Sequence, residues 1–189
     1  MEPRLICLIG AECTGKTTLA QALAQLMDGL WVPEYLRSFT QVHGRTPQRD
    51  EQLHILQEQL RMETEALTIA RQQGRRVVFC DTAPLLSAVY SDCVFADASL
   101  YPQARSLHAR YALTLFLQPD IPWHADGLQR DGPEARAAVH LAIESALAAS
   151  DDDAWPVVRI AGTAAQRLVQ ACDAAAGAMR ADRIREIGL

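Results

Sequence analysis

The chain has 189 residues, of which 49% are hydrophobic; this is enough for one domain with a real core and too little for two full domains. Its formal net charge is −5, and its 18 basic residues are scattered, so the composition argues against a nucleic-acid-binding protein. No apolar run approaches the roughly 20 residues that span a bilayer, and the first residues lack the pattern of a signal peptide. We therefore expect residues 1–189 to form a single cytoplasmic domain that contacts neither nucleic acid nor membrane.

Short apolar runs alternate with helical patterns along the chain. The expected strands are Leu5–Ile9, Leu30–Val32, Arg76–Cys80, Leu113–Leu117 and Val157–Ile160. The expected helices begin near Lys16 and near Ala83, and three longer ones cover Glu51–Gln73, Pro133–Ala149 and Ala164–Met179. The first strand is apolar on both faces, and the strands alternate with helices. These features predict an α/β fold in which helices flank a five-stranded parallel sheet.

The segment that follows the fourth expected strand has a different composition. Residues 120–132 are polar and irregular and include Pro122, Gly127 and Gly132. A mobile segment over a ligand has this composition, and so does an ordinary surface connection. We expect a lid at about residues 120–136.

A glycine-rich sequence, GAECTGKT, follows the first expected strand and matches G-x-x-x-x-G-K-[ST] at every fixed position. Its glycines let the backbone curl so that N–H groups face phosphate oxygens, and the following helix adds its positive end. We therefore predict a P-loop NTPase fold, with Lys16 at the β- and γ-phosphates of ATP and the Thr17 hydroxyl on Mg²⁺. The expected nucleotide-binding residues are Gly10, Ala11, Glu12, Cys13, Thr14, Gly15, Lys16, Thr17 and Thr18.

Two acidic residues stand where expected strands end. Asp81 follows the apolar run Val77–Cys80, where an acid beside a P-loop holds Mg²⁺; the alternative is an N-cap of the helix near Ala83. Glu34 follows the second strand, and its alternative is an acid in the first turn of a helix. Because the carboxyl ends of parallel strands meet in one crevice, both acids should face the ligand. Either of them can orient an attacking hydroxyl and accept its proton, and either is a candidate catalytic residue.

The expected lid carries three further candidates. Trp123 lies in a polar loop, where it either stacks on a flat heterocycle or anchors the loop to the body. Arg130 and Arg136 lie on and just after this loop. Each is either an ordinary surface arginine or a residue that stabilises charge on a transferring phosphoryl group.

Four blocks together resemble the ribosylnicotinamide kinase domain of the NadR-like proteins, a P-loop nucleoside-kinase type within an AAA-type ATP-binding family. These blocks are Gly10–Thr18, Glu34–Arg37, Val78–Thr82 and Pro122–Leu128, and the last is the most specific. The resemblance extends from about Leu5 to Ile160. It implies transfer of the ATP γ-phosphate to the 5′-hydroxyl of nicotinamide riboside, which gives nicotinamide mononucleotide. The substrate-binding residues that it implies are Glu34, Tyr35, Arg37, Asp81, Trp123 and Asp126.

Two alternatives remain open at this point. One is a kinase that acts on another nucleoside or on a nucleotide. The other is a regulatory protein in which ATP binding switches a surface without kinase activity. Ala83 and Ala125 stand where the resembled family usually carries acids, and a regulator could have lost them.

Overall fold

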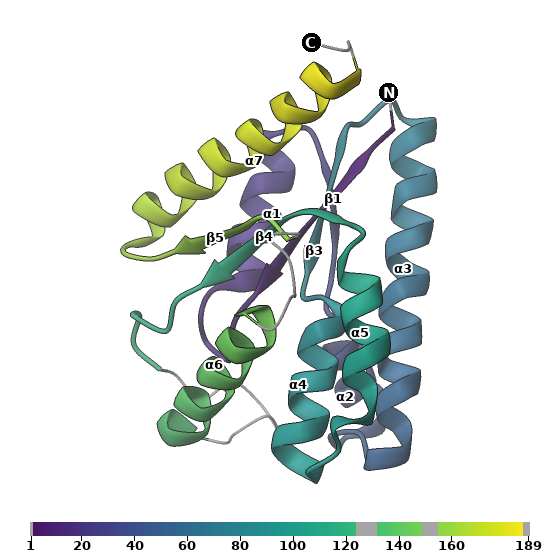
Figure 1. Cartoon of the computed structure of the whole chain (residues 1–189), viewed down its shortest axis with the longest axis vertical. Coiled ribbons are helices and arrows are strands. Elements are labelled where there is room, and N and C mark those ends of the chain that lie inside the picture. Colours follow the sequence, from purple (N-terminus) through teal and green to yellow (C-terminus); the bar gives the residue numbers. More distant parts are fainter. Residues whose placement is uncertain (1, 124–131, 149–154, 187–189) are drawn as a thin grey trace.

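The computed structural model describes residues 2–123, 132–148 and 155–186. Its sheet has five strands, which are β1 (Arg4–Ile9), β2 (Leu30–Val32), β3 (Val77–Asp81), β4 (Tyr111–Leu117) and β5 (Val157–Ile160). The strand order is β2-β3-β1-β4-β5, and every neighbouring pair is parallel (Figure 1). This confirms the expected five-stranded parallel sheet and gives the architecture of a P-loop NTPase.

Helices connect the strands. They are α1 (Lys16–Leu26), α2 (Tyr35–His43), α3 (Gln52–Gln72), α4 (Pro84–Phe95), α5 (Tyr101–His108), α6 (Gly132–Ala148) and α7 (Ala164–Glu186), with 3₁₀ turns at Arg49–Glu51 and Ala98–Leu100. The sequence patterns did not predict α2 and α5. Both are short, with nine and eight residues, so neither provides the long periodic pattern from which a helix is predicted with most certainty. None of the helices in the described ranges is long and apolar enough to cross a membrane.

Helices pack against both faces of the sheet (Figure 1). Ile6 and Leu8 of β1 point to the face covered by α1 and α7, whereas Ile9 packs in the cluster formed with α3, α4, α5 and α6. This alternation follows from the two-residue period of a strand, which sends successive side chains to opposite faces. A central strand buried on both faces must be continuously apolar, as β1 is after Arg4 and as β3 is before Asp81.

The interior of β3 gives a direct test of this core. Phe79 is fully buried between β3 and the helices α1 and α7. We expect Phe79→Ala to lower the free energy of unfolding by about 3–5 kcal/mol, because it removes a large buried ring and leaves a cavity. Urea unfolding monitored by circular dichroism measures the change. Val94→Ala on the exposed side of α4 is the matched control, and an equally small loss in both variants would contradict the assigned core.

Candidate active site

The candidate site lies where the carboxyl ends of three neighbouring strands meet. The glycine-rich loop follows β1, Asp81 ends β3, and Glu34 follows β2. These strands are adjacent in the order β2-β3-β1. The sheet therefore brings the loop and both acids to one edge, as expected from the convergence of parallel strand ends.

The loop is compact because a side chain would clash at its first glycine and would strain the backbone at its second. A Cβ atom on Gly10 would lie 2.8 Å from the Thr14 hydroxyl oxygen and 3.0 Å from the Leu117 carbonyl oxygen. Gly15 has a φ of 82°, which a residue with a side chain rarely adopts, and it directly precedes α1. The Thr14 hydroxyl donates to the Ala11 carbonyl oxygen at 2.8 Å and closes the loop. The resulting turn carries the backbone curvature of an anion-binding P-loop.

Lys16 is held inside this loop. Its Nζ donates to the carbonyl oxygens of Gly10 at 2.9 Å and Ala11 at 3.2 Å. Lys16 is also the first residue of α1, where the positive end of the helix dipole adds to its charge. The ammonium group and the helix end together make this the electropositive side of the site.

Thr17 and Asp81 form a pair that fits a magnesium ion. The Thr17 hydroxyl donates to Asp81 Oδ2 at 2.5 Å. Asp81 is fully buried, and its Oδ1 has no hydrogen-bond partner among the described residues. Magnesium takes oxygen ligands and keeps several waters, so one carboxylate and one hydroxyl are sufficient protein ligands. The alternative role of Asp81 as a helix N-cap is wrong. The N-cap residue of α4 is Ala83, and among the described residues no side chain caps this helix.

Glu34 is a buried carboxylate whose charge is only partly balanced. It is 7% exposed and precedes α2, and it forms no capping bond with the described helix. Burial raises its pKa above the ordinary glutamate range; the nearby Lys16 ammonium opposes this shift, and the Asp81 charge adds to it. Arg37 lies at the exposed rim, with its Nε 3.5 Å from Glu34 Oε2. A carboxylate with a raised pKa is suited to accept a proton near neutral pH.

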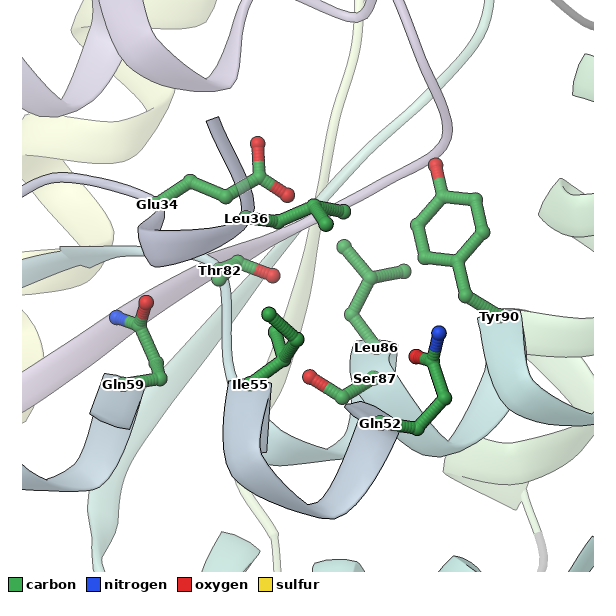
Figure 2. Close-up of a pocket in the computed structure, with 9 residues that line it drawn as sticks. All are labelled: Glu34, Leu36, Gln52, Ile55, Gln59, Thr82, Leu86, Ser87 and Tyr90. Carbon is green, nitrogen blue, oxygen red and sulfur yellow. The ribbon is translucent and has the colours of Figure 1, made fainter. Parts of the chain in front are cut away.

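A small cleft opens beside Glu34 (Figure 2). Its lining combines six polar side chains with three apolar ones and comes from the start of α2, from α3, and from α4 with the turn before it. The lining residues are Glu34, Leu36, Gln52, Ile55, Gln59, Thr82, Leu86, Ser87 and Tyr90. Most of the lining side chains are polar, so the cleft suits a ligand that carries hydroxyl or amide groups.

Thr82 is a strained residue on the wall of this cleft. Its φ is 94°, in the left-handed region that a β-branched residue rarely occupies. Its hydroxyl is buried and has no hydrogen-bond partner among the described residues. Strain and an unsatisfied polar atom at one residue are typical of sites that bind ligands.

Sequence reasoning missed most of the cleft. Gln52, Gln59, Ser87 and Tyr90 lie on helices outside any motif. A signal was present in α3, where buried Gln52 and Gln59 share helical spacing with buried Ile55. A buried glutamine on a core-facing stripe needs a polar partner. Gln59 has one, because its Oε1 accepts the Tyr35 backbone N–H at 2.9 Å.

Several predicted residues lie elsewhere. Trp123 is half-buried and does not line the cleft, so its stacking role stays a prediction. The Tyr35 hydroxyl lies 3.3 Å from His54 Nε2, outside the cleft.

Arg136 is buried and donates to the carbonyl oxygens of Ile121 at 3.0 Å and Cys13 at 3.4 Å. The remaining candidates of the predicted lid, Asp126 and Arg130, lie outside the described residues.

Comparison with known proteins identifies a family and a common fold. The family model described as AAA domain matches residues 5–167. Among curated proteins, none matches the sequence. The structure is similar to a NadR protein in complex with NAD and AMP-PNP, with 22% identity, a TM-score of 0.76, and coverage of 94% of this chain and 50% of that chain.

Two further structures share the fold. A NadR protein in complex with NR is 21% identical, with a TM-score of 0.73 and coverage of 94% of this chain and 52% of that chain. A deoxyadenosine kinase from M. mycoides, with the products dCMP and dCDP bound, is 10% identical, with a TM-score of 0.62 and coverage of 92% and 99%. The chain thus spans about half the length of the NadR structures that it matches. Identities this low establish a common fold.

The buried Glu34 charge predicts a gain in stability on its removal. The folded state binds the Glu34 proton more tightly than the unfolded chain does, so the free energy of unfolding falls as pH rises through the raised pKa. Glu34→Gln has no titratable group at this position, so its free energy of unfolding does not fall for this reason as pH rises. We expect the variant to unfold at a higher urea concentration than the wild type at pH 8, and the difference to shrink toward pH 4. The exposed Glu65→Gln is the control, and a lower midpoint for Glu34→Gln at pH 8 would contradict the assignment.

Proposed function

Because the chain belongs to the AAA domain family, as the match over residues 5–167 shows, we propose that it is an ATP-dependent kinase for a small nucleoside, with nicotinamide riboside as its acceptor. One observation carries the proposal. Glu34 lines the cleft and also interacts electrostatically with Lys16 and Asp81 of the phosphate-binding side. A kinase needs this arrangement, in which an acceptor hydroxyl and a γ-phosphate meet beside a carboxylate.

The P-loop binds ATP in this proposal. Backbone N–H groups between Gly10 and Thr18 face the phosphates, and Lys16 exchanges its two carbonyl partners for phosphate oxygens. Thr17 and Asp81 would hold Mg²⁺, which when bound neutralises charge on the β- and γ-phosphates. The buried Oδ1 of Asp81 supports this role, since a buried carboxylate oxygen requires a partner.

The cleft favours an acceptor without a phosphate group over a phosphorylated one. Of the described residues that line it, none is Lys or Arg, and the single charged group is the Glu34 carboxylate. A nucleotide acceptor brings a phosphate, which Glu34 would repel and which would need an arginine or lysine partner. A nucleoside brings hydroxyl groups and a heterocycle, which suit the polar side chains and the apolar walls of the cleft. Nicotinamide riboside fits this class, and the resemblance to the NadR kinase domain and the NadR structure with NR both favour it.

Glu34 is the better of the two candidate bases. Asp81 accepts a hydrogen bond from Thr17 and does not line the cleft, whereas Glu34 lines the cleft and interacts electrostatically with Lys16. An acceptor hydroxyl in the cleft can therefore reach the Glu34 carboxylate. Glu34 would orient this hydroxyl and accept its proton as the bond to phosphorus forms.

A screen of nucleosides with ATP and Mg²⁺ tests the proposed reaction. We expect ADP release to rise above the rate with water alone for nicotinamide riboside, and a phosphorylated product to appear in equal amount. Lys16→Ala should remove most of the turnover without unfolding the chain, because it deletes the cation that contacts the phosphates. Turnover with a different nucleoside would reassign the acceptor. ATP binding without any acceptor would instead favour the regulatory alternative.

Paired substitutions separate the base from the metal ligand. We expect Glu34→Gln to lower kcat by about 10²–10⁴-fold, the usual contribution of a general base, while ATP·Mg²⁺ still binds. Asp81→Asn should instead raise the Mg²⁺ concentration needed for half-maximal turnover. Steady-state kinetics across a Mg²⁺ titration distinguish the two. A shift in Mg²⁺ demand for Glu34→Gln, with none for Asp81→Asn, would reverse the assignment.

A further inference from the structure

A buried arginine at the start of α7 joins three segments next to the P-loop. Arg167 lies in the first turn of α7 and is 5% exposed. Its Nη1 donates to the Thr14 carbonyl oxygen at 2.9 Å, its Nη2 to the Gln118 carbonyl oxygen at 2.8 Å, and its Nε to the Gly162 carbonyl oxygen at 2.8 Å. These oxygens belong to the P-loop, to the residue after β4, and to the turn between β5 and α7. One guanidinium thus fixes three backbone segments that are distant in sequence.

Asp120 completes this junction. Its Oδ1 accepts a hydrogen bond from Arg167 Nη2, and its Oδ2 accepts the Gly162 backbone N–H at 2.6 Å. The carboxylate therefore holds the guanidinium and the β5–α7 turn together. An arginine is suited to this place because its planar group presents several donors in fixed directions.

A second arginine holds the preceding carbonyl of the same loop. Arg136 Nη2 donates to the Cys13 carbonyl oxygen at 3.4 Å, and Arg167 holds the next carbonyl, that of Thr14. Both guanidinium groups are buried against the body of the protein. Two consecutive peptide planes of the P-loop are therefore anchored by their oxygens.

Anchoring the oxygens fixes the direction of the N–H groups. In a trans peptide unit the C=O bond and the following N–H bond point in opposite directions, and the described chain contains no cis peptide. The peptide unit of the Cys13 carbonyl carries the Thr14 N–H, and that of the Thr14 carbonyl carries the Gly15 N–H. Both N–H groups therefore point away from the arginines, toward the side of the loop that takes an anion.

We propose that Arg167, assisted by Arg136, is a positioning residue that orients the Thr14 and Gly15 N–H groups toward the phosphates of the bound nucleotide. This inference rests on the proposed ATP binding. It gives Arg136 a role different from the expected contact with the transferring phosphoryl group, since the described guanidinium contacts backbone oxygens. The arginines act through the P-loop and not by touching the nucleotide.

The test compares two substitutions at Arg167 with two phosphate ligands. Arg167→Met removes charge and donors, and Arg167→Lys keeps the charge but cannot form the same fork. We expect both to weaken ATP binding by about 10–100-fold, as the loss of one or two well-placed hydrogen bonds implies. Isothermal titration with ATP and with inorganic tripolyphosphate, which has no base, measures the effect. Nicotinamide riboside affinity should stay unchanged.

The outcomes separate the possible explanations. Equal losses for ATP and tripolyphosphate support the inference. A loss for ATP alone would overturn it, because Arg167 would then act through the β5–α7 turn and not through the phosphates. If Arg167→Lys binds both ligands with wild-type affinity, the inference is also overturned, because the positive charge alone would then explain the effect of Arg167. A wild-type chain that binds neither ligand would refute the proposed function itself.

Two further variants guard against misfolding. Arg159→Met removes an exposed arginine of β5 that pairs with Glu144, and it should leave both affinities unchanged. Asp120→Asn keeps the size of the residue that holds Arg167 and should produce a smaller loss in the same direction, with both ligands. If Arg167→Met fails to fold, Asp120→Asn and Arg167→Lys still decide the question. Unchanged affinity for both ligands in this pair would refute the inference.

Discussion

Parallel pairing of β1 with β3 fixes the spacing on which the rest of the site depends. Leu8 pairs with Asp81, and the glycine-rich loop begins two residues beyond Leu8. The register therefore sets the acid beside the first turn of α1, close enough for Thr17 to donate to it. A register shift of one residue would turn Asp81 to the opposite face of the sheet and separate the pair. The apolar residues of these two strands are thus as necessary to the chemistry as the polar residues at their ends.

Two carboxylates near the site lie in a poorly hydrated place. Glu34 is buried at the edge of the sheet, and Glu63 is fully buried on α3, where burial raises its pKa to about 7. Tyr111 donates to both Glu63 oxygens, at 2.7 and 2.8 Å, and Gln59 donates to one of them at 3.4 Å. These contacts reduce the cost of burying Glu63 and fix the Gln59 amide that lines the cleft. A site built this way gives up some stability for groups held in defined positions.

The sequence predicts the framework well because the framework has local causes. Central parallel strands are continuously apolar, and the P-loop is a contiguous motif, so the strands and the Thr17–Asp81 pair can be inferred from neighbouring residues. The cleft could not be inferred, since Gln52, Ser87 and Thr82 meet there only through the packing of α3 and α4. The contact between Thr14 and Arg167 joins residues 153 positions apart, and no motif connects them.

The position of Lys16 has a consequence for selectivity. Its ammonium group already holds two hydrogen bonds to the carbonyl oxygens of Gly10 and Ala11. Any ligand that engages Lys16 must exchange these bonds for its own, so the gain in affinity is a difference between two sets of contacts. Only an anion with several oxygens can exceed what the loop itself provides. An uncharged metabolite gains no affinity from this exchange. The two existing hydrogen bonds of Lys16 therefore favour the binding of anions over neutral molecules in the loop.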